Sequence, residues 1–87
     1  MKEDEKKFFR LCYRYIRSSN QYNIKMYTPR ELINILDGWL PHKRAWYYLS
    51  KWDRLGFYEW GVTEDLGWLI LDKIPQRYLD LLKENKE

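Results

Sequence analysis

The stretch PHKRAWYYLSKWDRLGFYEW, residues 41–60, mixes basic and aromatic side chains so closely that the fold depends on how they are sorted. On a helix, successive residues turn by about 100°, so side chains three or four positions apart share a face. One face then carries the apolar set Ala45, Tyr48, Leu49 and Trp52. The opposite face, between about 140° and 260° from Ala45, carries Lys43, Arg44, Tyr47, Ser50, Lys51 and Arg54. The pattern predicts a helix over 41–55 with a core face and a basic outward face.

A second helix is predicted just before this stretch. Thr28 can cap it, Pro29 suits its first turn, and Glu31 can return a hydrogen bond to the capping residue. Its apolar side chains, Leu32, Ile35 and Leu36, are expected to point inward. Gly38 can adopt the left-handed conformation that ends such a helix, so two helices joined by a tight turn are expected.

The N-terminal segment predicts an amphipathic helix over 3–18 that ends at Ser18-Ser19-Asn20. Its apolar stripe is formed by Phe8, Phe9, Cys12, Tyr15 and Ile16, and the basic residues Lys7, Arg10, Arg14 and Arg17 lie off that stripe. The following segment, Tyr22–Tyr27, alternates partially and predicts a short strand.

A hairpin and a last helix are predicted after Gly56. The runs 57–62 and 68–71 are typical of strands, and residues 63–67 form the turn between them. Pro75 interrupts the pattern, and Tyr78, Leu79 and Leu82 then place one apolar face on a short C-terminal helix.

Composition bounds the class of protein. The 87 residues form one predicted domain, 1–87, and 18% aromatic residues with 45% hydrophobic residues indicate a folded chain. No apolar run approaches the roughly 20 residues of a membrane span, and no signal-like segment is seen, so a cytoplasmic protein without membrane contact is expected. The net charge of +3 is unevenly spread: residues 1–20 and 42–56 are basic, and 57–74 are acidic.

The residue types argue against catalysis and metal binding. The sequence contains one His and one Cys, whereas zinc sites use three or four such ligands. It has neither a glycine-rich phosphate loop nor a nucleophile motif. We therefore expect no enzyme activity, no metal and no cofactor.

The order of elements resembles the winged helix-turn-helix family, over residues from about 3 to 85. The resemblance is carried by a turn hydrophobe, the core positions of the third helix and a glycine-aromatic step into the wing: Leu40, Ala45, Leu49, Trp52, Gly56 and Phe57. It implies a mostly helical α+β fold, with a three-helix bundle, a two- or three-stranded hairpin wing and a short C-terminal helix.

This resemblance implies binding of double-stranded DNA, with helix 41–55 in the major groove. Lys43, Arg44, Tyr47, Ser50 and Lys51 would then read the bases and Arg54 would contact a phosphate, as in a small transcriptional regulator or an accessory of a DNA transaction. The first helix would add charge neutralisation. Two departures are a turn at Gly38-Trp39-Leu40 about one residue longer than the commonest one, and an acidic wing tip at Glu64 and Asp65.

Two further modes of association are predicted. Surplus apolar residues on the terminal helices, among them Leu11, Tyr13 and Tyr78, would support a homodimer. The alternative to DNA is a protein-interaction module, in which the acidic hairpin 57–72 seats a protein partner on Trp60, Leu66 and Trp68.

Overall fold

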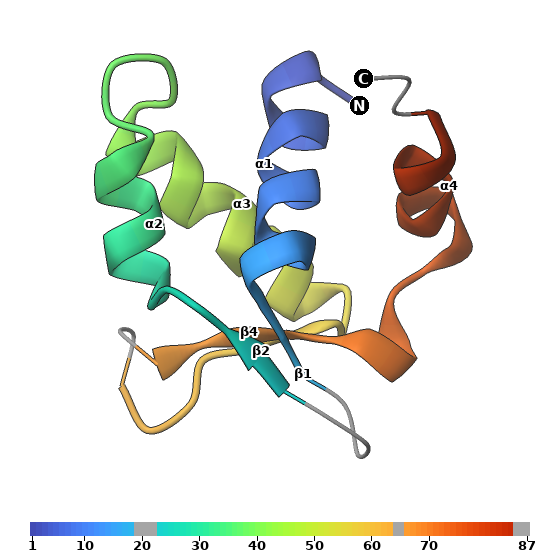
Figure 1. Ribbon diagram of the computed structural model, residues 1–87. Helices are drawn as coiled ribbons and strands as arrows, with labels where there is room; N and C mark the ends of the chain where they lie inside the picture. The colour runs from blue at the N-terminus through green and yellow to red at the C-terminus, as the bar shows by residue number, and fades with distance from the viewer. Residues whose placement is uncertain (19–22, 64–65, 85–87) are drawn as a thin grey trace.

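The computed structural model describes residues 1–18, 23–63 and 66–84, and in these segments four α-helices lie on one side of a four-stranded sheet (Figure 1). The helices are α1 (Glu3–Tyr15), α2 (Pro29–Ile35), α3 (His42–Arg54) and α4 (Gln76–Glu84). The strands are β1 (Ile16–Ser18), β2 (Asn23–Lys25), β3 (Tyr58–Glu59) and β4 (Trp68–Ile70), and the short 3-10 helix η2 (Leu71–Lys73) follows β4. The α+β class and the mostly helical composition predicted from sequence are confirmed.

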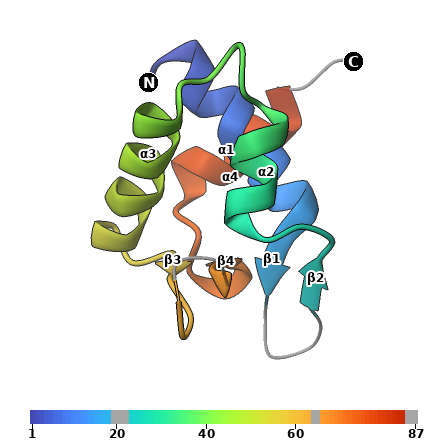
Figure 2. The same ribbon diagram turned by 90° about the vertical axis from the view of Figure 1, so that its left-hand side faces the viewer.

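The sheet has the strand order β2-β1-β4-β3, which Figure 2 shows along its lower edge. The predicted hairpin is present as the antiparallel pair β3 and β4, with shorter strands than expected. Its inner strand β4 also pairs in parallel with β1, where Arg17 lies opposite Leu69. Because of this second pairing, the sheet has four strands instead of the two or three predicted.

The end of α1 differs from the prediction. The helix stops at Tyr15, and the next three residues form β1, with Ile16 opposite Lys25 of β2. Ile16 is fully buried, so the apolar stripe does continue inward. The stripe could not distinguish a helix from a strand at this point, because both conformations keep Ile16 in the core. The predicted end at Ser19-Asn20 lies outside the described residues.

The caps of α2 and α3 follow the predicted chemistry. Thr28 and Glu31 form a reciprocal capping box, with Glu31 N–H donating to Thr28 Oγ1 at 3.1 Å and Thr28 N–H donating to Glu31 Oε1 at 2.8 Å. Gly38 and Gly56 have φ angles of 110° and 95°, a region that favours glycine. These local signals therefore mark the start and end of α2 and the end of α3.

The helix α2 turns a different face to the core than the sequence predicted. Leu32 and Leu36 are buried as expected, but Ile35 is 57% exposed and Ile33 is buried in its place. At about 100° per residue, the buried set Pro29, Leu32, Ile33 and Leu36 centres on a direction far from Ile35. The buried face is thus rotated toward Ile33.

The core is one aromatic-rich cluster that draws on every helix and on the sheet. Trp52 of α3 is fully buried and stacks on Phe8 of α1, with ring centroids 5.4 Å apart. Phe9 of α1 meets Tyr78 of α4 with centroids 5.3 Å apart. The radius of gyration of 12.0 Å equals the value of about 12 Å expected for a single unit of this length. Because Phe8 and Trp52 stack, α1 and α3 pack face to face, and their buried faces are fixed.

Candidate nucleic-acid interface

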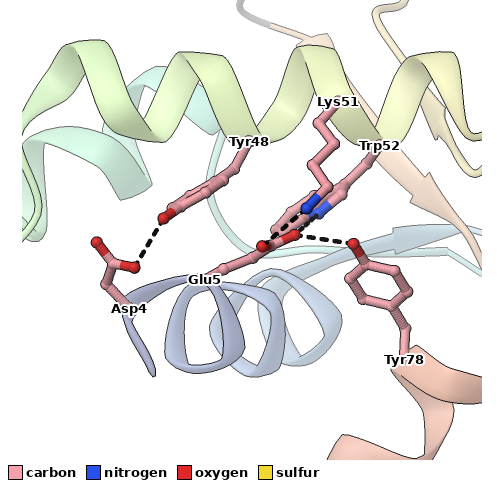
Figure 3. Close-up of polar contacts among 6 residues, drawn as sticks. All are labelled: Asp4, Glu5, Tyr48, Lys51, Trp52 and Tyr78. Carbon is pink, nitrogen blue, oxygen red and sulfur yellow. Dashed lines mark hydrogen bonds and ion pairs between the residues drawn. The ribbon is translucent and has the colours of Figure 1, made fainter. Parts of the chain in front are cut away.

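A buried carboxylate joins α1, α3 and α4. Glu5 is only 2% exposed, and three side chains donate hydrogen bonds to it (Figure 3). Trp52 Nε1 and Tyr78 Oη donate to Glu5 Oε2 at 3.0 and 2.8 Å, and Lys51 Nζ donates to Glu5 Oε1 at 3.1 Å. A buried charge is tolerated when it is paired and hydrogen-bonded in this way. The cluster therefore locks the start of α1 against the other two helices.

The neighbouring carboxylate, Asp4, holds the edge of α3. Arg44 Nη1 donates to Asp4 Oδ2 at 2.8 Å, and Tyr48 Oη donates to Asp4 Oδ1 at 2.7 Å. Hydrogen bonds with an ionised partner are stronger than neutral ones. Asp4 and Glu5 thus form ion pairs with Arg44 and Lys51, two of the four cations that the sequence assigns to the basic face of α3.

The pKa values follow from these contacts. Burial raises the pKa of Glu5, but the hydrogen bonds from Trp52, Tyr78 and Lys51 lower it by more than burial raises it. The pKa therefore lies below its ordinary value of 4.5. Burial also raises the pKa of Asp4, and the hydrogen bonds from Arg44 and Tyr48 outweigh it, so this pKa lies below 3.8. Burial and the Glu5 carboxylate raise the pKa of Tyr78 to about 12. Both carboxylates are therefore ionised at neutral pH.

The outward face of α3 is narrower than predicted. Lys43, Tyr47 and Arg54 are exposed, and Ser50 is half-buried. Tyr47 is 56% exposed, and the Arg54 guanidinium lies 6.0 Å from its ring centroid. Lys43 and Arg54 form no ion pair within the part of the chain that the structure describes. We call Lys43, Tyr47 and Arg54 the outer stripe of α3.

Arg44 and Lys51 lie beside this stripe and pair with Asp4 and Glu5, two contacts that the sequence interpretation did not include. They fall at the edge of the predicted basic face, nearest to Tyr48, and that edge faces α1. The side chain of Arg44 is 48% exposed. The side chain of Lys51 is only 33% exposed and contacts the core carboxylate Glu5. Lys51 therefore does not point away from the core.

The sequence interpretation missed Asp4 and Glu5. A charged run at a helix start is normally a solvated first turn that suits the helix dipole. A signal was nevertheless present, because Glu5 lies three, four and seven residues before Phe8, Phe9 and Cys12 and so shares their face. A carboxylate on an apolar stripe predicts a buried partner, although the stripe does not identify that partner.

The residues of the alternative protein-binding surface are only partly available. Trp60 is half-buried, stacks on Trp46 with centroids 6.1 Å apart, and donates to Asp53 Oδ2 at 3.1 Å. Trp68 is half-buried beneath Lys25, whose Nζ lies 4.3 Å from the ring centroid. Leu66 is 45% exposed. The predicted acidic tip, Glu64 and Asp65, lies outside the described residues.

The predicted dimer surface loses its main aromatic residue. Tyr78 is 0% exposed and belongs to the core of the single chain. Leu11 and Tyr13 are half-buried and pack against that core. The argument from surplus apolar side chains is therefore weaker than the sequence indicated.

Clusters of metal-ligating side chains and membrane-spanning helices are absent from the part of the chain that the structure describes. Over residues 1–18, 23–63 and 66–84, no group of three or more His, Cys, Asp or Glu residues is placed to hold a metal ion. No helix in these segments has the length and apolar character needed to cross a membrane. No protein-family model, curated protein or solved structure matches the chain.

Proposed function

We propose that this chain is a winged-helix module that binds double-stranded DNA through the outer stripe of α3. The observation that carries the proposal is Tyr47, which is 56% exposed between two cations on a helix whose other aromatic side chains are buried or half-buried. An exposed ring flanked by Lys43 and Arg54 suits contact with both bases and phosphates. As a small regulator or an accessory of a DNA transaction, the module would place α3 in the major groove.

The packing of α3 supports this role. Its opposite face is fixed by the buried side chains of Ala45, Leu49 and Trp52, so the outer stripe is presented on a rigid element. The turn at Gly38 separates α2 from α3, and the β3–β4 hairpin follows α3 directly. This order of helix, turn, helix and hairpin suits the entry of a helix into the major groove.

The contacts of Asp4 and Glu5 lower the number of phosphates that α3 can neutralise. Arg44 and Lys51 already have carboxylate partners, which leaves Lys43 and Arg54 to meet DNA. Two phosphate contacts give a log–log dependence of affinity on salt with a slope of about −1.8, half the value for four contacts.

The test is the affinity for a fluorescent duplex, measured by anisotropy at about 100 mM salt, where phosphate contacts still contribute strongly. The double variant Lys43→Glu, Arg54→Glu should bind at least about tenfold more weakly, because it replaces two attractions by two repulsions. The matched control, Lys73→Glu, Lys83→Glu, changes the net charge equally at two exposed positions on other elements. Equal affinities for the parent and the α3 variant would refute the proposal.

The hairpin remains a second candidate surface because two apolar side chains near its turn are exposed. Val62 is 92% and Leu66 is 45% exposed. A protein-docking role predicts that replacing Leu66 abolishes binding of a partner, whereas the α3 variant leaves that binding unchanged. It also predicts no duplex binding by the parent.

A further inference from the structure

A second basic surface lies on the outer face of α1. Lys7, Arg10, Arg14 and Arg17 line one open groove of about 1110 Å³, with Trp39 on one side and Leu82 of α4 on the other. Lys7 Nζ lies 5.0 Å from the centroid of the Trp39 ring, and Arg10 Nε donates to the carbonyl oxygen of Leu81 at 3.0 Å. The flanking residues thus hold two of the cations in place along the floor of the groove.

This surface carries two accessible cations, as many as the outer stripe of α3. Lys7 and Arg14 are exposed, and neither forms an ion pair with another described residue. The carboxylates of the groove, Glu3 and Asp4, lie at its N-terminal end, and both already have cationic partners, Lys6 and Arg44. The rest of the groove is therefore positively charged, and we call its cations Lys7, Arg10, Arg14 and Arg17 the track.

The two basic surfaces face in different directions. Lys7 and Arg14 lie opposite the buried face of α1, which meets α3 through Phe8 and Trp52, so the groove opens away from α3. The outer stripe lies roughly 60° to 100° around α3 from the edge that meets α1, so it faces another side of the molecule. Figure 1 shows α1 crossing in front of α3, and Figure 2, turned by 90°, shows α3 at one edge of the molecule. Packed helices have axes 8–10 Å apart and side chains that extend about 5 Å farther on each side, so roughly 20 Å separates the two surfaces. One straight duplex cannot lie on both.

We propose that the groove on α1 binds the phosphate backbone of a second DNA duplex, so that one copy of the protein bridges two duplexes. The inference rests on the proposed function of α3. From Lys7 to Arg14 the helix rises by about 10 Å, which matches three steps of about 3.4 Å along the duplex axis between successive phosphates of one strand. Arginine also forms bidentate hydrogen bonds with phosphate.

The two duplexes are bound differently. The track on α1 is the floor of a groove, so it can cradle a backbone but cannot enter the major groove and read bases. It binds without sequence preference and more weakly than α3, in the range of about 10⁻⁴ to 10⁻⁶ M typical of non-specific contacts. At low protein concentration a single duplex therefore reports on α3, and capture of a second duplex reports on α1.

The experiment compares single-duplex affinity with bridging. Bridging is the amount of a dye-labelled duplex that the protein retains on beads carrying an unlabelled duplex, at about 50 mM salt. The variant Lys7→Glu, Arg14→Glu should retain at least about tenfold less labelled duplex than the parent, with single-duplex affinity changed by less than about threefold. The matched control is again Lys73→Glu, Lys83→Glu, which should bridge like the parent.

Three results would overturn the inference and leave the proposed function of α3 intact. The α1 variant could bridge as well as the parent, or the parent could bind one duplex and capture no second one. In the third result, sedimentation shows that the parent is a dimer and that the α1 variant is not, so that bridging was lost with the dimer. Loss of single-duplex affinity in the α1 variant, with none in the Lys43→Glu, Arg54→Glu variant, would instead refute the proposed function itself.

Discussion

The cations of α3 form two pairs that differ in what they contact. Arg44 and Lys51 lie on the edge that faces α1, where Asp4 and Glu5 hold them at 2.8 and 3.1 Å. Lys43 and Arg54 lie on the opposite edge and have no carboxylate partner among the residues that the structure describes. The four cations look equivalent in the sequence, but the first pair would have to leave its carboxylates to contact a ligand.

The difference between the pairs shows that charge on a helix has to be counted after its partners are known. An angle of roughly 60° to 100° around α3 separates a cation that stabilises the fold from one that faces solvent. The partners come from a segment about forty residues earlier in the chain. The following predictions test this division, from the largest expected effect to the smallest.

The largest effect is expected at the buried partner of the first pair. Glu5→Ala should lower the free energy of unfolding by about 2–4 kcal/mol, because it leaves the buried Trp52 and Tyr78 donors and the Lys51 ammonium without an acceptor. Urea denaturation measures this change.

Matched substitutions define the comparison. Glu3→Ala removes an exposed carboxylate from the same helical turn and should change stability by less than about 0.5 kcal/mol. The variant Lys43→Glu, Arg54→Glu should also stay close to the parent in stability. If Glu5→Ala were as stable as Glu3→Ala, the carboxylate would not join the three helices.

Acid should remove the same stabilisation. Because the folded-state pKa of Glu5 lies below its ordinary value of 4.5, ionised Glu5 stabilises the fold fully above pH 4.5. That stabilisation is lost as the pH falls through the lower folded-state pKa. The melting temperature of the parent should therefore fall below pH 4.5 more steeply than that of Glu5→Gln, and parallel curves for the two proteins would contradict the assignment.

A smaller effect is expected on DNA affinity when Arg44 is released. Asp4→Asn removes the charge that holds Arg44 and should tighten duplex binding by about three- to tenfold, since one more phosphate can be neutralised. Glu3→Gln removes the same charge one residue earlier, where it pairs with Lys6, and should change affinity by less than about twofold. Equal effects of the two variants would show that net charge matters and that the Arg44–Asp4 pair does not.

Local patterns in the sequence predicted much of this fold. The buried face of α3, the capping box at Thr28 and the glycine at position 56 each depend on residues within one or two helical turns, and all three are confirmed. The rotation of α2 toward Ile33 and the parallel pairing of β1 with β4 were not predictable in this way. Both depend on packing between segments far apart in the chain.

The candidate site was predicted less completely than the fold. Lys43, Tyr47 and Arg54 were found from helical periodicity alone, because exposure is the default for the face opposite a core. The roles of Arg44 and Lys51 depend on Asp4 and Glu5, and the burial of Glu5 depends in turn on Tyr78, 73 residues away. No window of sequence contains all of these partners.

The most direct test of DNA binding by the outer stripe of α3 is the salt dependence of duplex affinity. The parent should show a log–log slope of about −1.8, and Lys43→Glu, Arg54→Glu should lose the tight binding at every salt concentration. A slope near −3.6 would mean that Arg44 and Lys51 leave their carboxylates to contact DNA. Duplex affinity and slope unchanged in the α3 variant, or no duplex binding by the parent, would contradict the central claim.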